Sequence, residues 1–218
     1  IINPDRQLML FAADVLSRNP GGKIIFDVKC TRNLAPWISQ HGGIPIMWKT
    51  GHSLIKAKMK EESAVLAGEM SGHMFFADRY FGYDDAVYAS CRLVEILAKT
   101  RRPLSTLVAD LPKTVVTPEI RVDLPDAVKF DVVERVRLRF SEYLRSKQGL
   151  GPSKLVLRDL ITIDGVRGIF DDGWGLIRAS NTQPALVLRF EATSAAQLNL
   201  IRAIVEEELL EAKRAVGC

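Results

Sequence analysis

The chain has 218 residues, of which 47% are hydrophobic and 26% are charged. This length and composition exclude a disordered or fibrous chain and allow one large domain or two small ones. The net charge of +4 comes from 30 basic residues interleaved with 26 acidic ones, which argues against a nucleic-acid-binding face and favours a small anionic ligand.

No apolar run approaches the roughly 20 residues that a membrane helix needs, so no membrane partner is predicted. Residues 1–5 lack the basic and apolar segments of a signal peptide, and a start at Ile1 is expected for a piece of a longer chain. The cysteines are far apart and form neither a disulfide framework nor a zinc motif, which predicts a cytoplasmic protein. They are Cys30, Cys91 and Cys218.

The first hundred residues alternate helical and strand patterns. The first helix is predicted to begin at Asn3-Pro4-Asp5, because Asn is a common N-cap and Pro suits the first helical position, and to reach Leu16. After it we expect a strand over 23–28, a helix over 31–38 capped by Thr31, a strand over 44–48, a helix over 53–62, a strand over 64–68 and a helix over 84–99. This α/β alternation predicts a three-layer α/β/α domain with a mixed, largely parallel sheet.

Prolines and the pair Arg101-Arg102 interrupt the pattern between residues 100 and 118, so the domain boundary is placed there, with domains over 1–110 and 111–218. After it we expect a strand over 115–124, a helix over 127–147, two or three strands between 160 and 192 and a helix over 194–215. Consecutive strands without intervening helices predict an α+β domain with an antiparallel sheet and helices on one face.

Polar loops follow three predicted strands of the first domain. Lys29 follows the first strand, Gly51-His52 follows the second, and the loop with Glu69, Ser71 and His73 follows the third. The carboxyl ends of parallel strands share the edge where ligands bind, and a carboxylate beside a hydroxyl suits sugar hydroxyls. A plain polar turn would explain any one of these loops; their coincidence at one edge favours a site.

A fourth polar loop, Arg178-Ala179-Ser180-Asn181-Thr182, lies between two predicted strands of the second domain. The planar guanidinium of Arg178 suits a phosphate, the Ser, Asn and Thr side chains add donors, and a turn can direct backbone N–H groups at an anion. An ordinary hairpin loop with a surface arginine is the alternative, and residue chemistry alone leaves both open.

In this order, the segments FDVKCTR (26–32), MWKTGHSLIK (47–56), LAGEMSGHMFF (66–76) and GWGLIRASNTQPALVLRFEA (173–192) resemble the α-D-phosphohexomutase superfamily. The Glu-Met-Ser form of the third loop favours the bacterial phosphomannomutase/phosphoglucomutase branch over phosphoglucosamine mutases. The resemblance implies a four-domain isomerase that interconverts hexose 1-phosphates and 6-phosphates, with this chain as domains three and four.

The resemblance also implies roles for single residues. Glu69 and Ser71 are expected to bind sugar hydroxyls. The non-reacting phosphate is expected to contact Arg178, Ser180, Asn181 and Thr182. The remaining substrate contacts are expected from Lys29, Gly51, His52 and His73, with His52 the candidate for proton transfer.

This sequence departs from the family in what it lacks: it has no phosphoserine motif and no run of alternating Asp and Gly. The phosphoserine and the Mg²⁺ ligands are therefore expected in domains one and two of the same parent chain, and no metal site is expected here. The expected ligands are hexose phosphates, with glucose 1,6-bisphosphate as intermediate and activator. Alone, this chain is expected to be inactive. A free-standing phosphosugar-binding module without catalysis is the alternative.

Overall fold

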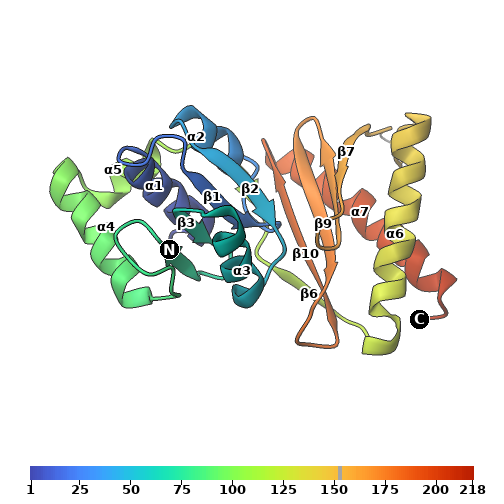
Figure 1. Cartoon of the computed structure of the whole chain (residues 1–218). Coiled ribbons are helices and arrows are strands. Elements are labelled where there is room, and N and C mark those ends of the chain that lie inside the picture. Colours follow the sequence, from blue (N-terminus) through green and yellow to red (C-terminus); the bar gives the residue numbers. More distant parts are fainter. Residues whose placement is uncertain (152–153) are drawn as a thin grey trace. The chain divides into compact units, whose positions relative to one another are not determined.

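The computed structural model describes residues 1–151 and 154–218, which divide into two compact units, Ile1–Pro112 and Lys113–Cys218 (Figure 1). Each unit has its own β-sheet and its own hydrophobic core. Within the described residues, every helix is too short or too polar to cross a membrane.

The first unit is built on a four-stranded sheet in the order β2-β1-β3-β4. The central strand β1 (Lys23–Asp27) pairs in parallel with β2 (Ile44–Trp48) and with β3 (Leu66–Gly68). The edge strand β4 (Met74–Phe76) returns antiparallel to β3. The predicted mixed, largely parallel sheet is therefore confirmed.

Helices cover both faces of this sheet, because successive residues of β1 point to opposite sides. Ile25 packs in one core with Ile55 and Met59 of α3 (His52–Glu62). Ile24 and Phe26 belong to the larger core on the other face. The helices that contribute to this larger core are α1 (Pro4–Leu16), α2 (Leu34–Gln40), α4 (Ala86–Thr100) and α5 (Leu104–Ala109). This arrangement confirms the predicted three layers.

The second unit has an antiparallel sheet in the order β5-β10-β9-β8-β7, with β6 also paired to β10. Its strands are β5 (Val115–Val116), β6 (Ile120–Asp123), β7 (Leu157–Ile161), β8 (Val166–Phe170), β9 (Gly173–Ala179) and β10 (Ala185–Ala192). The long helices α6 (Asp126–Ser146) and α7 (Ala195–Ala215) pack on one face of the sheet (Figure 1). The predicted antiparallel sheet with helices on one face is confirmed.

Three expectations for the first unit are wrong in detail. Helix α2 begins at Leu34, because the Thr31 hydroxyl accepts a hydrogen bond from the Asn33 N–H (3.2 Å) in a turn before the helix. The three-residue strand β4 was missed, since so short a segment carries no periodicity. The expected linker contains α5, whose N-cap is Pro103 and whose Leu107 is buried in the core, so this proline precedes a helix rather than ending one.

Two expectations for the second unit also need correction. The single strand expected over 115–124 is two strands, because Pro118 has no N–H for the ladder. Thr117 carries the pairing up to that break: its N–H donates to the Phe190 carbonyl (3.0 Å), and its hydroxyl accepts from the Phe190 N–H (3.1 Å). The two or three strands expected between 160 and 192 are four, starting at Leu157.

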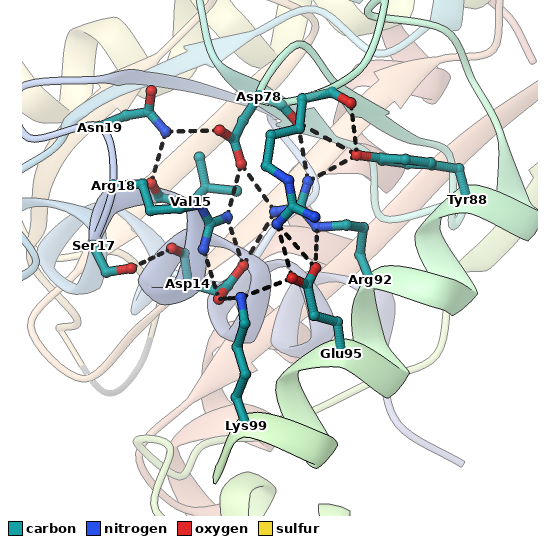
Figure 2. A network of polar contacts seen from close by, with 11 residues as sticks. Asp14, Val15, Ser17, Arg18, Asn19, Asp78, Tyr88, Arg92, Glu95 and Lys99 are labelled. Atoms are coloured by element: carbon teal, nitrogen blue, oxygen red, sulfur yellow. Dashed lines mark hydrogen bonds and ion pairs between the residues drawn. The ribbon is translucent and has the colours of Figure 1, made fainter.

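A network of ion pairs ties α4 to the rest of the first unit (Figure 2). The buried guanidinium of Arg92 lies 3.1 Å from Asp14 of α1 and 2.9 Å from Asp78, which follows β4. Arg18 lies 2.8 Å from the same two carboxylates. Burial alone would raise the pKa of Asp14, but the hydrogen bonds from Arg18 and Arg92 hold it below its usual value. The network therefore fixes α1 and α4 beside the β3–β4 hairpin.

We expect Arg92→Met to lower the free energy of unfolding of the first unit by about 2 kcal/mol, because the partly buried carboxylates of Asp14 and Asp78 each lose one of their charged partners. Urea denaturation at pH 7 measures this change. Arg102→Met is the matched control, since the side chains of Arg102 and of its partner Asp110 are 45% and 55% exposed. This substitution should lower the free energy of unfolding by no more than about 1 kcal/mol. Equal effects of the two substitutions would contradict the role given to the network.

The same variant should show a pH dependence. The folded pKa of Asp14 is lowered, so its contribution to stability is complete above the unfolded value of 3.8 and is lost as the pH falls through the folded pKa. The difference in the free energy of unfolding between wild type and Arg92→Met should therefore become smaller as the pH falls below 3.8.

Candidate ligand-binding sites

Three loops of the first unit leave the sheet at one edge. The parallel register pairs Asp27 of β1 with Trp48 of β2, and Phe26 of β1 with Gly68 of β3, so the carboxyl ends of the three strands are level. The loop after β1 carries Lys29. The loops after β2 and β3 carry the other candidate site residues of this unit. These are Gly51 and His52 after β2, and Glu69, Ser71 and His73 after β3.

A single buried carboxylate joins all three loops. Asp27 is 0% exposed. Its Oδ1 accepts hydrogen bonds from the Cys30 thiol (3.0 Å) and the Met70 N–H (3.2 Å), and its Oδ2 accepts from the Thr50 hydroxyl (3.0 Å). The ammonium of Lys29, which is itself buried, lies 3.8 Å from Oδ2. Sequence reasoning missed Asp27; the available signal was an acidic residue inside an otherwise apolar strand.

Glu69 is the second buried carboxylate at this edge, with 1% of its surface exposed. Its Oε1 accepts a hydrogen bond from the Gly51 N–H (2.7 Å), while its buried Oε2 has no hydrogen-bond partner among the described residues. Gly51 has φ +135°, a conformation that favours glycine, so the loop after β2 needs this residue to bring its N–H to Glu69.

The electrostatics of Glu69 follow from this position. Burial raises its pKa above the usual value, the Gly51 N–H acts in the opposite direction, and the negative charge of Asp27 raises it further. A buried carboxylate oxygen without a partner costs free energy. It is also a strong acceptor for a ligand hydroxyl, which is the chemistry a sugar supplies.

The two candidate histidines lie near each other, His52 at the start of α3 and His73 in the loop after β3. The ring centroids of His52 and His73 are 6.0 Å apart. The Nδ1 atom of His73 lies 2.6 Å from the carboxylate of Asp84, whereas the Nδ1 atom of His52 lies 3.4 Å from the hydroxyl of Ser53. Asp84 therefore orients one histidine, a contact that the sequence did not reveal. Ser71, in the turn between Glu69 and His73, is exposed.

In the second unit, Arg178 lies at the end of β9 and is held by a carboxylate. Its Nε donates a hydrogen bond to Asp164 (3.1 Å), which lies in the turn between β7 and β8. The next residue, Gly165, has φ +84°, and a Cβ there would lie 2.4 Å from the carbonyl oxygen of Ile177. This close packing of the turn on β9 places Asp164 beside the arginine. Asp164 was also missed from the sequence.

The turn after Arg178 is shaped by Ser180. The Ser180 hydroxyl oxygen accepts hydrogen bonds from the N–H groups of Thr182 (3.3 Å) and Gln183 (3.2 Å). These two backbone N–H groups therefore point into the turn, towards the Ser180 hydroxyl. The side chains of Asn181 and Thr182 are exposed. Arg178, Ser180 and the exposed Asn181 and Thr182 thus form one short donor-rich segment. No group of three or more His, Cys, Asp or Glu residues in the described part of the chain could hold a metal ion.

Comparison with known families finds matches over almost the whole chain. Residues 3–115 match the family described as phosphoglucomutase/phosphomannomutase, alpha/beta/alpha domain III. Residues 119–208 match the phosphoglucomutase/phosphomannomutase C-terminal domain.

Curated relatives and solved structures agree with these matches. The chain is 52% identical to a phosphomannomutase/phosphoglucomutase of Pseudomonas putida and 51% identical to a phosphoglucomutase of Neisseria gonorrhoeae, over 96% and 94% of its length. It spans only 42% and 43% of those proteins. A crystal structure of a phosphoglucomutase/phosphomannomutase family protein from Burkholderia thailandensis matches with TM-score 0.84 and 50% identity, over 98% of this chain and 42% of that one.

A more distant structure shares the fold alone. It is an Aspergillus fumigatus N-acetylphosphoglucosamine mutase in complex with glucose 1,6-bisphosphate, with TM-score 0.66 and 14% identity, and the match covers 99% of this chain and 44% of that one.

We expect Asp27→Ala to lower the free energy of unfolding by at least about 2 kcal/mol, because one buried and two partly buried donors lose their acceptor. Hydrogen exchange in residues 49–52 and 69–73 should become faster. Asp27→Asn is the matched control: its carbonyl oxygen can accept from Met70, and its amide can donate to the Thr50 oxygen. If hydrogen exchange in these loops became equally fast in both variants, the hydrogen bonds to residue 27 would not be what holds the loops in place.

We expect Glu69→Gln to raise the unfolding temperature at neutral pH. The folded pKa of Glu69 is raised, so its ionisation opposes folding at neutral pH, and this cost disappears as the pH falls through the raised pKa towards the ordinary value of 4.5. Calorimetry from neutral to acidic pH measures the difference. A variant that is less stable than wild type at neutral pH would contradict this account.

Proposed function

Because the chain belongs to the phosphoglucomutase/phosphomannomutase family, we propose that it is the substrate-binding part of an enzyme that interconverts hexose 1-phosphates and hexose 6-phosphates. The observation that carries the proposal is the buried Oε2 of Glu69, an acceptor without a partner among the described residues, in a loop that other contacts hold in place.

The first unit, residues 1–112, is proposed to bind the sugar. Glu69 and Ser71 contact hydroxyls that glucose and mannose share, with Glu69 as the acceptor and Ser71 able to donate or accept. Lys29 and His73 complete the polar edge of the sheet. Gly51 contributes by holding Oε1 of Glu69, which directs Oε2 to the sugar. His52 is the proposed proton-transfer group, since an imidazole can donate a proton from one ring nitrogen and accept one at the other.

The second unit, residues 113–218, is proposed to bind the phosphate that does not react. Arg178 supplies a planar, charged donor, and the Asp164 carboxylate on its Nε fixes the plane of the guanidinium. Ser180 keeps its hydroxyl proton as a donor, since its oxygen accepts from the turn. Asn181 and Thr182 add exposed side-chain donors.

The phosphoryl transfer itself is proposed to belong to the other domains of a longer parent chain, which are then the main partner of these two units. A phosphoserine would give and take the phosphoryl group through a 1,6-bisphosphate. The complex of a structural neighbour with glucose 1,6-bisphosphate supports that intermediate. The ligands of the Mg²⁺ ion are likewise proposed to lie in those other domains. A cytoplasmic location is proposed from the cysteines, which are few and far apart in the sequence.

We expect the chain to bind glucose 1-phosphate and glucose 6-phosphate without interconverting them. Arg178→Ala should weaken binding about tenfold or more, because a charge-assisted hydrogen bond contributes about 1.5 to 3 kcal/mol. Isothermal titration measures the affinity, and a coupled assay measures turnover.

Arg202→Ala is the matched control, since Arg202 is an exposed arginine of α7, paired with Glu206. It should bind like wild type. An unchanged affinity in Arg178→Ala would overturn the phosphate assignment. Turnover by the chain alone would overturn the assignment of the chemistry to other domains.

A further inference from the structure

A buried lysine supports the phosphate-binding turn from behind. Lys129 of α6 is 4% exposed. Its ammonium lies 2.6 Å from the carbonyl oxygen of Ser180, 3.0 Å from that of Gln183 and 2.6 Å from the carboxylate of Asp126. An ammonium has three N–H donors, so all three have an acceptor. Two of these acceptors are the carbonyls at the two ends of the turn.

The contact with the Ser180 carbonyl determines where the next amide points. The peptide bond between Ser180 and Asn181 is trans, so its C=O and its N–H point in opposite directions. Because Lys129 holds the C=O, the N–H of Asn181 points away from the ammonium. That N–H bonds to no described residue, whereas the N–H groups of Thr182 and Gln183 bond to the Ser180 hydroxyl.

We propose that Lys129 is a positioning residue that directs the Asn181 N–H at the substrate phosphate. A hydrogen bond from a cation to the carbonyl polarises the peptide and makes its N–H a stronger donor. The inference rests on the proposed phosphate-binding role of this loop, and it adds a backbone donor to the expected side chains. Nothing in the sequence indicates this contact, since Lys129 and Ser180 are 51 residues apart.

The wild-type chain allows a direct test that needs no substitution. The full 218-residue chain, labelled with ¹⁵N, is titrated with inorganic phosphate and followed by NMR. The amide proton of Asn181 should move downfield, and further than those of Thr182 and Gln183, because only the Asn181 N–H is available to the anion.

Each other outcome is decisive. A larger shift at Thr182 or Gln183, or an unmoved Asn181 while residues around Arg178 respond, would overturn the Lys129 proposal and leave the phosphate site standing. If no amide in residues 178–184 responds, the phosphate assignment itself fails, and the role of Lys129 fails with it.

A substitution tests the same claim independently. Lys129→Met keeps the apolar stem and removes the ammonium, so it should weaken phosphate binding about tenfold, the effect of one hydrogen bond to a charged group. The downfield shift of Asn181 should disappear. Lys113→Met is the matched control, since it makes the same charge change at an exposed residue of the same unit. Its affinity should match that of wild type.

A folded Lys129→Met chain that binds phosphate as tightly as wild type would show that the lysine only ties the hairpin to α6. If the variant does not fold, the wild-type titration decides the question by itself.

Discussion

Asp27 lies at the end of β1 with both carboxylate oxygens occupied, one by Cys30 and Met70 and the other by Thr50. Parallel pairing brings the ends of β1, β2 and β3 to one edge, but it does not fix the loops that follow. A fully buried carboxylate must find donors, and the donors here come from all three loops. The positions of Gly51 and Glu69, and with them the proposed sugar contacts, depend on this one group.

The two units share one division, between supporting groups and the groups proposed to bind ligand. In the first unit, Asp27 has its hydrogen bonds satisfied within the protein, while Glu69 keeps a buried oxygen that the described residues leave without a partner. In the second unit, Lys129 is fully bonded behind the turn, while Asn181 presents an N–H that bonds to no described residue. A buried oxygen without a partner, such as Oε2 of Glu69, costs stability, and the satisfied groups behind the proposed ligand contacts hold their geometry.

The sequence predicted the layers of both units and the polar loops that form the candidate sites, because hydrophobic periodicity and turn residues are local signals. It did not predict Asp27, Lys129 or Asp164, whose roles depend on contacts between distant residues. Asp27 and Met70 are 43 residues apart, and nothing near either one in the sequence indicates the contact. The short elements β4 and α5 were missed for a related reason: tertiary packing, rather than a repeating pattern, stabilises segments of three to six residues.

We propose that the carboxyl edge of the first sheet presents Oε2 of Glu69 as a prearranged acceptor for a sugar hydroxyl. A crystal structure of this chain with glucose 6-phosphate would test this proposal. We expect a sugar hydroxyl within hydrogen-bonding distance of Oε2 of Glu69, with the Gly51 N–H still bonded to Oε1 and the three loops unmoved. A sugar bound elsewhere, with Oε2 of Glu69 not in contact with it, would rule the proposal out.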